Sequence, residues 1–215
     1  MPQHVFIAIE GAIGVGKTTL ARLIQDEFEA ELLLEVFEEN PFLKDFYKDR
    51  ERYAFQTQIF FLLSRYRQQH EVVEETLKRS SLISDYTFAK DSLFAHLNLR
   101  GDELLMYESV HAALAEKIPL PDLVVYLRAE TDILMERIAF RDRVYERDMD
   151  RDYIDAVNRA YEEFFLPYDH NPVLAIDTDN INIVRNKQDL AYVVGQIHAA
   201  LAGVRQPRLP EVGEI

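Results

Sequence analysis

The segment between residues 11 and 19 has glycines, a lysine and hydroxyl groups at the spacing of a phosphate-binding loop. It consists of Gly11, Ala12, Ile13, Gly14, Val15, Gly16, Lys17, Thr18 and Thr19. Glycine allows a backbone turn with positive φ, so the loop N–H groups can approach an anion closely. Lys17 would then reach the β- and γ-phosphates of ATP, and the Thr18 hydroxyl would ligate Mg²⁺. The segment therefore predicts a site for ATP with Mg²⁺.

Acidic residues follow two other apolar runs. Glu35 is expected in the last turn of a strand, where its carboxylate could accept a proton from an attacking hydroxyl. Glu38 and Glu39 are more typical of a solvated acidic loop. Asp85 is expected beside the phosphate-binding loop, where it would hold Mg²⁺ directly or through water. A helix N-cap is the competing role for Asp85.

A cluster of arginines lies further along the chain. Its members are Arg137, Arg141, Arg143, Arg147 and Arg151. Arg137 and Arg141 share a helix face, and the charged stretch that follows has almost no core residues. Guanidinium groups suit phosphoryl oxygens, so this pattern predicts a lid at about residues 141–151 that closes over bound phosphates. The competing interpretation is a charged surface that neighbouring carboxylates neutralise.

The elements that must position these residues alternate between strands and helices. Strands are expected at 5–9, 32–37, 82–85, 123–127 and 173–176, and helices at 17–29, 52–78, 93–99, 103–117, 130–140, 152–166 and 187–201. Short runs with few polar positions are typical of parallel strands that are covered on both faces. The pattern predicts a doubly wound α/β fold, a five-stranded parallel sheet flanked by helices on both faces. Ligands of such sheets bind at the carboxyl ends of the strands.

Length and composition limit the possible functions. With 215 residues and 48% hydrophobic residues, the chain is expected to form one domain over 1–204, followed by a flexible tail at 205–215. The net charge of −14 argues against a nucleic-acid partner, and no apolar run is long enough for a membrane span. The absence of cysteine excludes disulfides and thiolate metal sites. No signal peptide is apparent, so a cytoplasmic location is expected.

Further stretches of the sequence carry a family resemblance. They are Asn40-Pro-Phe-Leu, Phe46-Tyr47, Arg52-Tyr-Ala-Phe-Gln-Thr-Gln58, Leu63-Ser-Arg65, Asp85-Tyr-Thr-Phe-Ala-Lys-Asp91, Phe94-Ala95 and Arg137…Arg141-Asp-Arg143. With these stretches the chain resembles the deoxyribonucleoside kinases, in particular the bacterial deoxyadenosine/deoxyguanosine kinase branch. The resemblance implies a P-loop kinase fold with an Arg-rich lid and a homodimer. It also implies transfer of the ATP γ-phosphoryl group to the 5′-hydroxyl of a deoxyribonucleoside, with Mg²⁺, in nucleotide salvage.

The resemblance also implies roles for individual residues. Glu35 matches the carboxylate that accepts the 5′-hydroxyl proton, Gln58 matches the amide that pairs with the base edge, and Arg65 and Asp91 match polar groups around the base. Tyr47 and Glu146 match residues that hold the sugar 3′-hydroxyl. The lid arginines on the ATP phosphates are matched by Arg137, Arg141 and Arg143. Asp85 matches the acidic residue near Mg²⁺. Phe55 and Phe88 could supply apolar walls on which a base stacks.

Three positions depart from the family pattern. Tyr86, which is expected to contact the substrate, stands where many relatives have an arginine that helps to hold the base and the reacting oxygen. Val36 replaces the usual proline after the catalytic glutamate. The alignment around Asp91 can shift by one residue, which would bring Lys90 into its place. A purine base, that of deoxyadenosine or deoxyguanosine, is the expected preference.

Other functions are compatible with parts of the sequence. A nucleoside monophosphate kinase of the thymidylate-kinase type would share the fold and the loop, but it would need an arginine directly after Asp85. A GTP-driven switch protein is suggested by Asn186-Lys187-Gln188-Asp189, although the Asp-x-x-Gly of such proteins is missing after a strand. A non-catalytic nucleotide-binding module is disfavoured, because Glu35, Lys17 and the lid arginines are all present.

Overall fold

The computed structural model describes residues 4–147, 149–167 and 171–205. The strands are β1 (Phe6–Glu10), β2 (Ala30–Leu33), β3 (Ser81–Ser84), β4 (Leu123–Arg128) and β5 (Val173–Asp177). The helices are α1 (Lys17–Ile24), α2 (Leu43–Lys48), α3 (Arg50–Leu77), α4 (Lys90–Asn98), α5 (Gly101–Ala115), α6 (Thr131–Arg141), α7 (Arg151–Phe165) and α8 (Lys187–Arg205), with short 3₁₀ turns at Phe37–Glu39 and Val144–Glu146. The predicted tail lies almost wholly outside the described residues.

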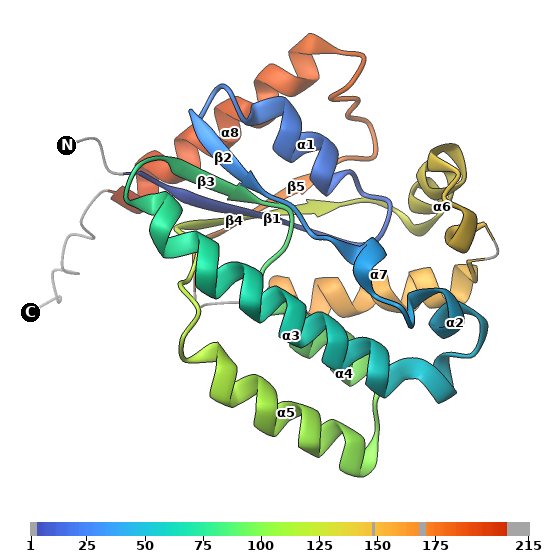
Figure 1. Ribbon diagram of the computed structural model, residues 1–215. Helices are drawn as coiled ribbons and strands as arrows, with labels where there is room; N and C mark the ends of the chain where they lie inside the picture. Colours follow the sequence, from blue (N-terminus) through green and yellow to red (C-terminus); the bar gives the residue numbers. More distant parts are fainter. Residues whose placement is uncertain (1–3, 148, 168–170, 206–215) are drawn as a thin grey trace, which may run out of the picture.

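The five strands form one parallel sheet in the order β2-β3-β1-β4-β5. Helices α1 and α8 cover one face, and α3, α4 and α7 cover the other, with α5 outside α3 and α4 (Figure 1). This arrangement confirms the predicted five-stranded α/β sheet with helices on both faces. Among the described helices, we find none with the length and apolar character needed to span a bilayer.

The second predicted strand was placed too late in the sequence. β2 covers Ala30–Leu33 rather than 32–37, and it pairs with β3 up to Leu33 opposite Ser84, where β3 itself ends. Without a partner strand, the chain leaves the sheet and forms the 3₁₀ turn at Phe37–Glu39. Glu35 therefore lies in the loop after β2, still at the carboxyl edge of the sheet.

Several helices also differ from the expected bounds; α8, for example, ends at Arg205 instead of residue 201. α1 ends at Ile24 instead of residue 29, because the chain turns back through Glu29, whose φ of 46° is outside the helical region. α4 begins at Lys90, three residues before the predicted start at 93. The earlier start places Lys90 in the first turn of α4. The short helix α2 was not predicted.

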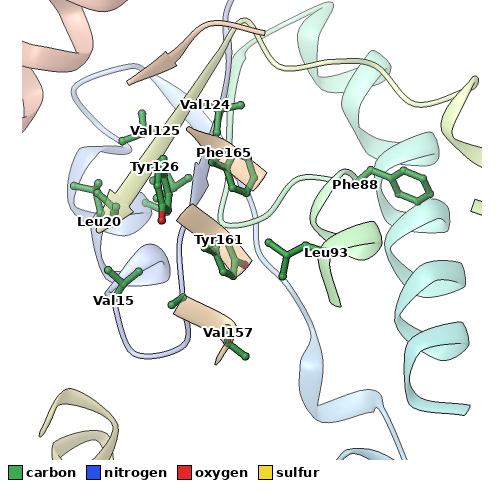
Figure 2. Packing of buried hydrophobic residues seen from close by; sticks show 14 of the residues in the cluster. Val15, Leu20, Phe88, Leu93, Val124, Val125, Tyr126, Val157, Tyr161 and Phe165 are labelled. Atoms are coloured by element: carbon green, nitrogen blue, oxygen red, sulfur yellow. The ribbon is translucent and has the colours of Figure 1, made fainter. Parts of the chain in front are cut away.

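Aromatic packing fixes α7 beneath the centre of the sheet. Tyr126 of β4 stacks with Phe165 of α7 at a centroid distance of 5.4 Å and with Tyr161 at 6.2 Å (Figure 2). All three side chains are buried, and such pairs stabilise beyond the area that they remove from water. The Tyr161 hydroxyl then donates to Glu10 Oε2 at 3.2 Å, so α7 is tied to the strand that precedes the glycine loop.

The glycine loop fits tightly against β4 at its first residue. Gly11 has a φ of +142°, and a Cβ there would lie 2.3 Å from the Leu127 carbonyl oxygen. Gly16 has a φ of +108°, but a Cβ there would meet no described atom within 4 Å. Gly11 is therefore required by both conformation and space, and Gly16 by conformation alone.

We expect this difference to appear in stability. Gly11→Ala should lower the free energy of unfolding by about 3 kcal/mol through backbone strain and overpacking combined. Gly16→Ala should cost about 1–2 kcal/mol, because it adds only the backbone strain. Urea-induced unfolding of both variants measures the difference, and equal losses would contradict the tight fit at Gly11.

Candidate active site

A cavity of about 120 Å³ opens at the carboxyl edge of the sheet. It is lined by many of the predicted site residues: Ile13, Gly14, Lys17, Thr18, Glu35, Tyr47, Gln58, Arg65, Asp85, Arg141, Arg143 and Glu146. These residues come from the glycine loop, the loops after β2 and β3, and helices α2, α3 and α6 with the turn that follows. The strand ends thus bring together groups that lie far apart in the sequence.

Lys17 is held by the loop that precedes it. Its Nζ donates to the carbonyl oxygens of Gly11 at 2.8 Å and of Ala12 at 3.1 Å. Burial and the nearby charge of Lys90 lower the pKa of Lys17 to about 8. A cation in this environment is stabilised by an anion, and a phosphate group would supply one.

Asp85 connects the glycine loop to the loop after β2. Its Oδ2 accepts a hydrogen bond from the Thr18 hydroxyl, and its Oδ1 accepts from the backbone N–H of Glu35 at 2.8 Å. The hydroxyl and carboxylate oxygens of Thr18 and Asp85 thus lie in direct contact. Mg²⁺ in kinase sites uses one or two such protein oxygens together with water and substrate phosphates, so this pair fits that ion.

The carboxylate of Glu35 is paired with two cations. Its Oε1 accepts from Arg65 Nε at 2.8 Å and also from Arg65 Nη2, while its Oε2 accepts from Lys90 Nζ at 2.8 Å. Burial alone would raise the pKa of Glu35, but the charges and hydrogen bonds of Arg65 and Lys90 outweigh it and hold the pKa well below its ordinary value. Glu35 is therefore a fixed anion inside the cavity.

Asp91 lies behind Arg65 rather than in the cavity. Its side chain is fully buried, and its Oδ1 accepts from Arg65 Nη1. A one-residue shift of the alignment would put Lys90 in the place of Asp91. Lys90 does line the cavity. Asp91 thus supports Arg65 from behind as a buried ion pair, and a contact of Asp91 with a base stays a prediction. The sequence could not decide this point, because it depends on where α4 begins.

Helix α3 presents Gln58 and Arg65 to the same cavity, two turns apart as their spacing predicts. Gln58 is 2% exposed, and its Oε1 has no hydrogen-bond partner among the described residues. A buried amide oxygen without a partner is costly unless a ligand satisfies it. Gln58 is thus suited to pair with the edge of a bound base.

Besides Asp91, three further predicted substrate residues do not line the cavity. Phe88 stacks on His111 of α5 at 4.8 Å, and Phe55 packs against the core as a half-buried side chain. The Tyr86 hydroxyl donates to Gln68 Oε1 at 2.9 Å, and its ring packs with Phe6 and Val73. The predictions of base stacking by Phe55 and Phe88 and of substrate contact by Tyr86 are therefore corrected, because these side chains point into packed regions.

Other residues form the apolar walls. The cavity is lined instead by Phe37, Phe61 and Phe94, together with Tyr145, Tyr153 and Tyr161, none of which was predicted from the sequence. Phe61 stands three residues after Gln58, and Phe94 stands four residues after Lys90. Helical spacing from a known pocket residue would therefore have found both.

The lid segment closes one side of the cavity. Arg141 Nε donates to Glu146 Oε2 at 3.1 Å, and Arg143 Nη1 lies 3.5 Å from Glu146 Oε1. The Arg143 guanidinium also lies 4.0 Å from the centre of the Phe37 ring. Glu146 is buried and lines the cavity with Tyr47, as the predicted role at a sugar hydroxyl requires. Movement of this lid stays a prediction.

Arg137 faces a second cavity, of about 720 Å³, on the other side of the glycine loop. Its Nη1 donates to Thr178 Oγ1 at 3.0 Å and to the Val15 carbonyl oxygen at 3.3 Å. Gly14 and Arg141 line both cavities. Residues 181–185, which lie between β5 and α8 and were not predicted as site residues, form the far wall. The glycine loop therefore lies between two binding spaces.

The guanine-reading pattern at residues 186–189 has a structural role. Asn186 Nδ2 donates to Asp189 Oδ1 at 2.8 Å, and Asp189 Oδ2 accepts from the Asn182 N–H at 2.7 Å. Asn186 Oδ1 also accepts from the Gln188 N–H at 2.9 Å. The polar groups of the pattern thus satisfy one another at the start of α8, which accounts for these residue types without a guanine ligand.

Comparisons with known proteins agree with this geometry. The family model described as deoxynucleoside kinase matches residues 7–202. The chain is 32% identical over 197 residues to a deoxyguanosine kinase of Bacillus subtilis, covering 89% of this chain and 95% of the relative. It is 35% identical over 168 residues to a deoxyadenosine kinase of Dictyostelium discoideum, covering 75% and 67%.

A solved structure shares the fold. The deoxyadenosine kinase from M. mycoides with bound dATP superposes with a TM-score of 0.78 at 27% identity, covering 91% of this chain and 100% of that chain. This match confirms the P-loop kinase fold. Because the family model spans nearly the whole chain, the protein belongs to the deoxynucleoside kinase family and is an ATP-dependent deoxynucleoside kinase.

Proposed function

We propose that this enzyme transfers the γ-phosphoryl group of ATP to the 5′-hydroxyl of a purine deoxyribonucleoside, with Glu35 as the base. The observation that carries the proposal is the position of Glu35. Its backbone N–H is held by Asp85, which also accepts from Thr18 of the glycine loop. Its carboxylate faces the cavity that Gln58 lines. These contacts support a single carboxylate between the proposed triphosphate site and the proposed base site.

The proposed reaction needs alignment more than covalent help from the protein. The 5′-hydroxyl gives its proton to Glu35, its oxygen bonds to the γ-phosphorus, and the bond from that phosphorus to the β–γ bridging oxygen breaks to release ADP. Lys17, Arg141 and Arg143 line the cavity, and in this proposal they neutralise the phosphoryl oxygens. Thr18 and Asp85 would hold Mg²⁺, which supplies further neutralisation of the phosphates. The family assignment favours a nucleoside over a nucleoside monophosphate as acceptor.

Replacement of the proposed base tests this assignment. Glu35→Gln keeps the shape and a hydrogen-bonding oxygen but removes the proton acceptor, so kcat should fall about 10²- to 10⁴-fold without a comparable loss of nucleoside affinity. Glu39→Gln is the matched control, because Glu39 is exposed on the same loop and should leave kcat unchanged. Steady-state kinetics and equilibrium binding give both quantities. Unchanged turnover in Glu35→Gln would remove Glu35 from this role.

A purine preference is supported by the relatives, and the cavity adds features that suit a base of either class. Relatives that the chain resembles are a deoxyguanosine kinase and a deoxyadenosine kinase. The unpartnered Oε1 of Gln58 offers an acceptor to an amino or imino group on a base edge. The phenylalanines around it form apolar walls for a ring.

A panel of the four deoxynucleosides with ATP and Mg²⁺ measures this preference. We expect kcat/KM for deoxyadenosine or deoxyguanosine to exceed the values for deoxycytidine and thymidine about 10-fold or more. Deoxynucleoside 5′-monophosphates serve as the control acceptors and should give no turnover. A pyrimidine deoxynucleoside as the best substrate would reject the purine assignment while leaving the kinase reaction intact.

The lowered pKa of Lys17 predicts how donor binding depends on pH. At pH 7 the side chain is already charged, because its pKa is about 8. Above that value the free enzyme loses the proton, whereas bound phosphates favour the charged form, so ATP binding must take up a proton and weaken as the pH rises. Calorimetry at pH 9 in buffers of different ionisation enthalpy should show uptake of about one proton per bound ATP.

The control for this titration is Lys17→Arg, since arginine stays charged at both pH values. Its ATP binding should show little proton uptake at pH 9. Equal uptake by the wild type and the variant would mean that another group takes up the proton.

A homodimer stays a prediction for this chain. Its support is a set of exposed apolar side chains on neighbouring helices: Leu63 of α3 is 50% exposed, and Leu105 and Met106 of α5 are 62% and 59% exposed. α3 and α5 pack together on one side of the molecule (Figure 1). Large apolar side chains gathered on one surface are typical of a protein interface.

A further inference from the structure

Lys90 is a buried cation that has no role in the proposed reaction, and the sequence considered it only as a substitute for Asp91. It is the first residue of α4 and is 3% exposed. Lysine is almost never buried to this extent without a partner. Its Nζ lies 2.8 Å from Glu35 Oε2, and it lines the same cavity as Lys17 and Thr18. The charge of Lys90 also contributes to the lowered pKa of Lys17, so the two cations influence each other.

The two cations on Glu35 are anchored differently. Arg65 is held by Glu35 on one side and by Asp91 on the other. For Lys90 Nζ, Glu35 is the carboxylate partner among the described residues, and the Tyr86 ring lies 5.6 Å away. An aromatic face tolerates a cation but holds it less firmly than a second carboxylate would. Lys90 can therefore leave Glu35 with fewer broken contacts than Arg65.

The proposed reaction requires one of these cations to move. Arg65 already donates twice to Glu35 Oε1, so Oε2 is the oxygen that an acceptor hydroxyl would reach. In the free enzyme Lys90 occupies Oε2. A carboxylate whose two oxygens are both paired with cations is a poor proton acceptor. The arrival of a triphosphate beside Lys17 would give Lys90 another anion in the same cavity.

We propose that Lys90 is a catalytic residue that moves from Glu35 Oε2 to an oxygen of the γ-phosphoryl group when donor and acceptor are both bound. This proposal rests on the proposed function. The move frees Oε2 to take the proton of the 5′-hydroxyl, while the bond from the 5′-oxygen to phosphorus forms and the bond from phosphorus to the leaving ADP oxygen breaks. Lys90 keeps its own proton and neutralises charge on the transferring group. It thereby supplies the cation that Tyr86 does not.

The test separates catalysis from structure. Lys90→Met should lower kcat about 10²- to 10³-fold, the loss typical of one group that stabilises a transition state. The nucleoside KM should change much less. Lys90→Gln can still donate to Glu35 Oε2 but carries no charge, so its kcat should fall by a similar factor. It replaces the methionine variant if that variant does not fold. Lys90→Arg should recover part of the loss. Lys44→Met, at an exposed lysine of α2, is the matched control.

A second readout reports on the transferring group directly. Nucleoside binding should tighten when ADP, Mg²⁺ and aluminium fluoride, a mimic of the moving phosphoryl group, are added to the wild type. Lys90→Met and Lys90→Gln should lose this gain but keep the affinity for the nucleoside alone. A purely structural ion pair would instead weaken both binding measurements equally.

The outcomes keep the two proposals apart. A wild-type enzyme that phosphorylates no deoxynucleoside would overturn the proposed function and this inference with it. An active wild type with Lys90→Met or Lys90→Gln within threefold of its kcat would overturn the role of Lys90 alone. The role of Lys90 would also be overturned if Lys90→Gln kept the wild-type kcat and lost only nucleoside affinity.

Discussion

Four charged side chains are buried together at the edge of the sheet. They are the carboxylates of Glu35 and Asp91 and the cations Arg65 and Lys90. Burial of single charges at these positions would cost several kcal/mol each, so each must have an opposite partner. This requirement fixes where α3 and α4 stand, because each helix contributes cations or carboxylates to the set. The shape of the acceptor cavity follows from it.

Asp85 links the loop that carries Glu35 to the glycine loop. One of its oxygens fixes the backbone of Glu35 and the other fixes the Thr18 hydroxyl, so the loop after β2 and the glycine loop cannot shift independently. Glu10, which is fully buried at the end of β1, ties Thr87 and Tyr161 to the same region. The site is thus built on side chains that are each held by a second element.

The sequence was sufficient for the sheet, the glycine loop and the acidic and basic residues of the cavity, because apolar runs and glycine spacing report on local backbone structure. It was not sufficient for features that depend on where an element begins or on what lies opposite. The start of α4 decides that Lys90 rather than Asp91 enters the cavity. Phe88 has the right residue type for a pocket wall, but His111 of α5 stacks on it, and such a tertiary partner has no local signal.

Arg141 has a consequence for how the enzyme responds to its two substrates. Its guanidinium bonds Glu146, which lines the smaller cavity, and Arg141 also lines the larger cavity on the other side of the glycine loop. A ligand in either space changes the surroundings of the same charged group. Thermodynamic linkage then makes the effect mutual: whatever factor the nucleoside imposes on the affinity for the nucleotide, the nucleotide imposes on the affinity for the nucleoside.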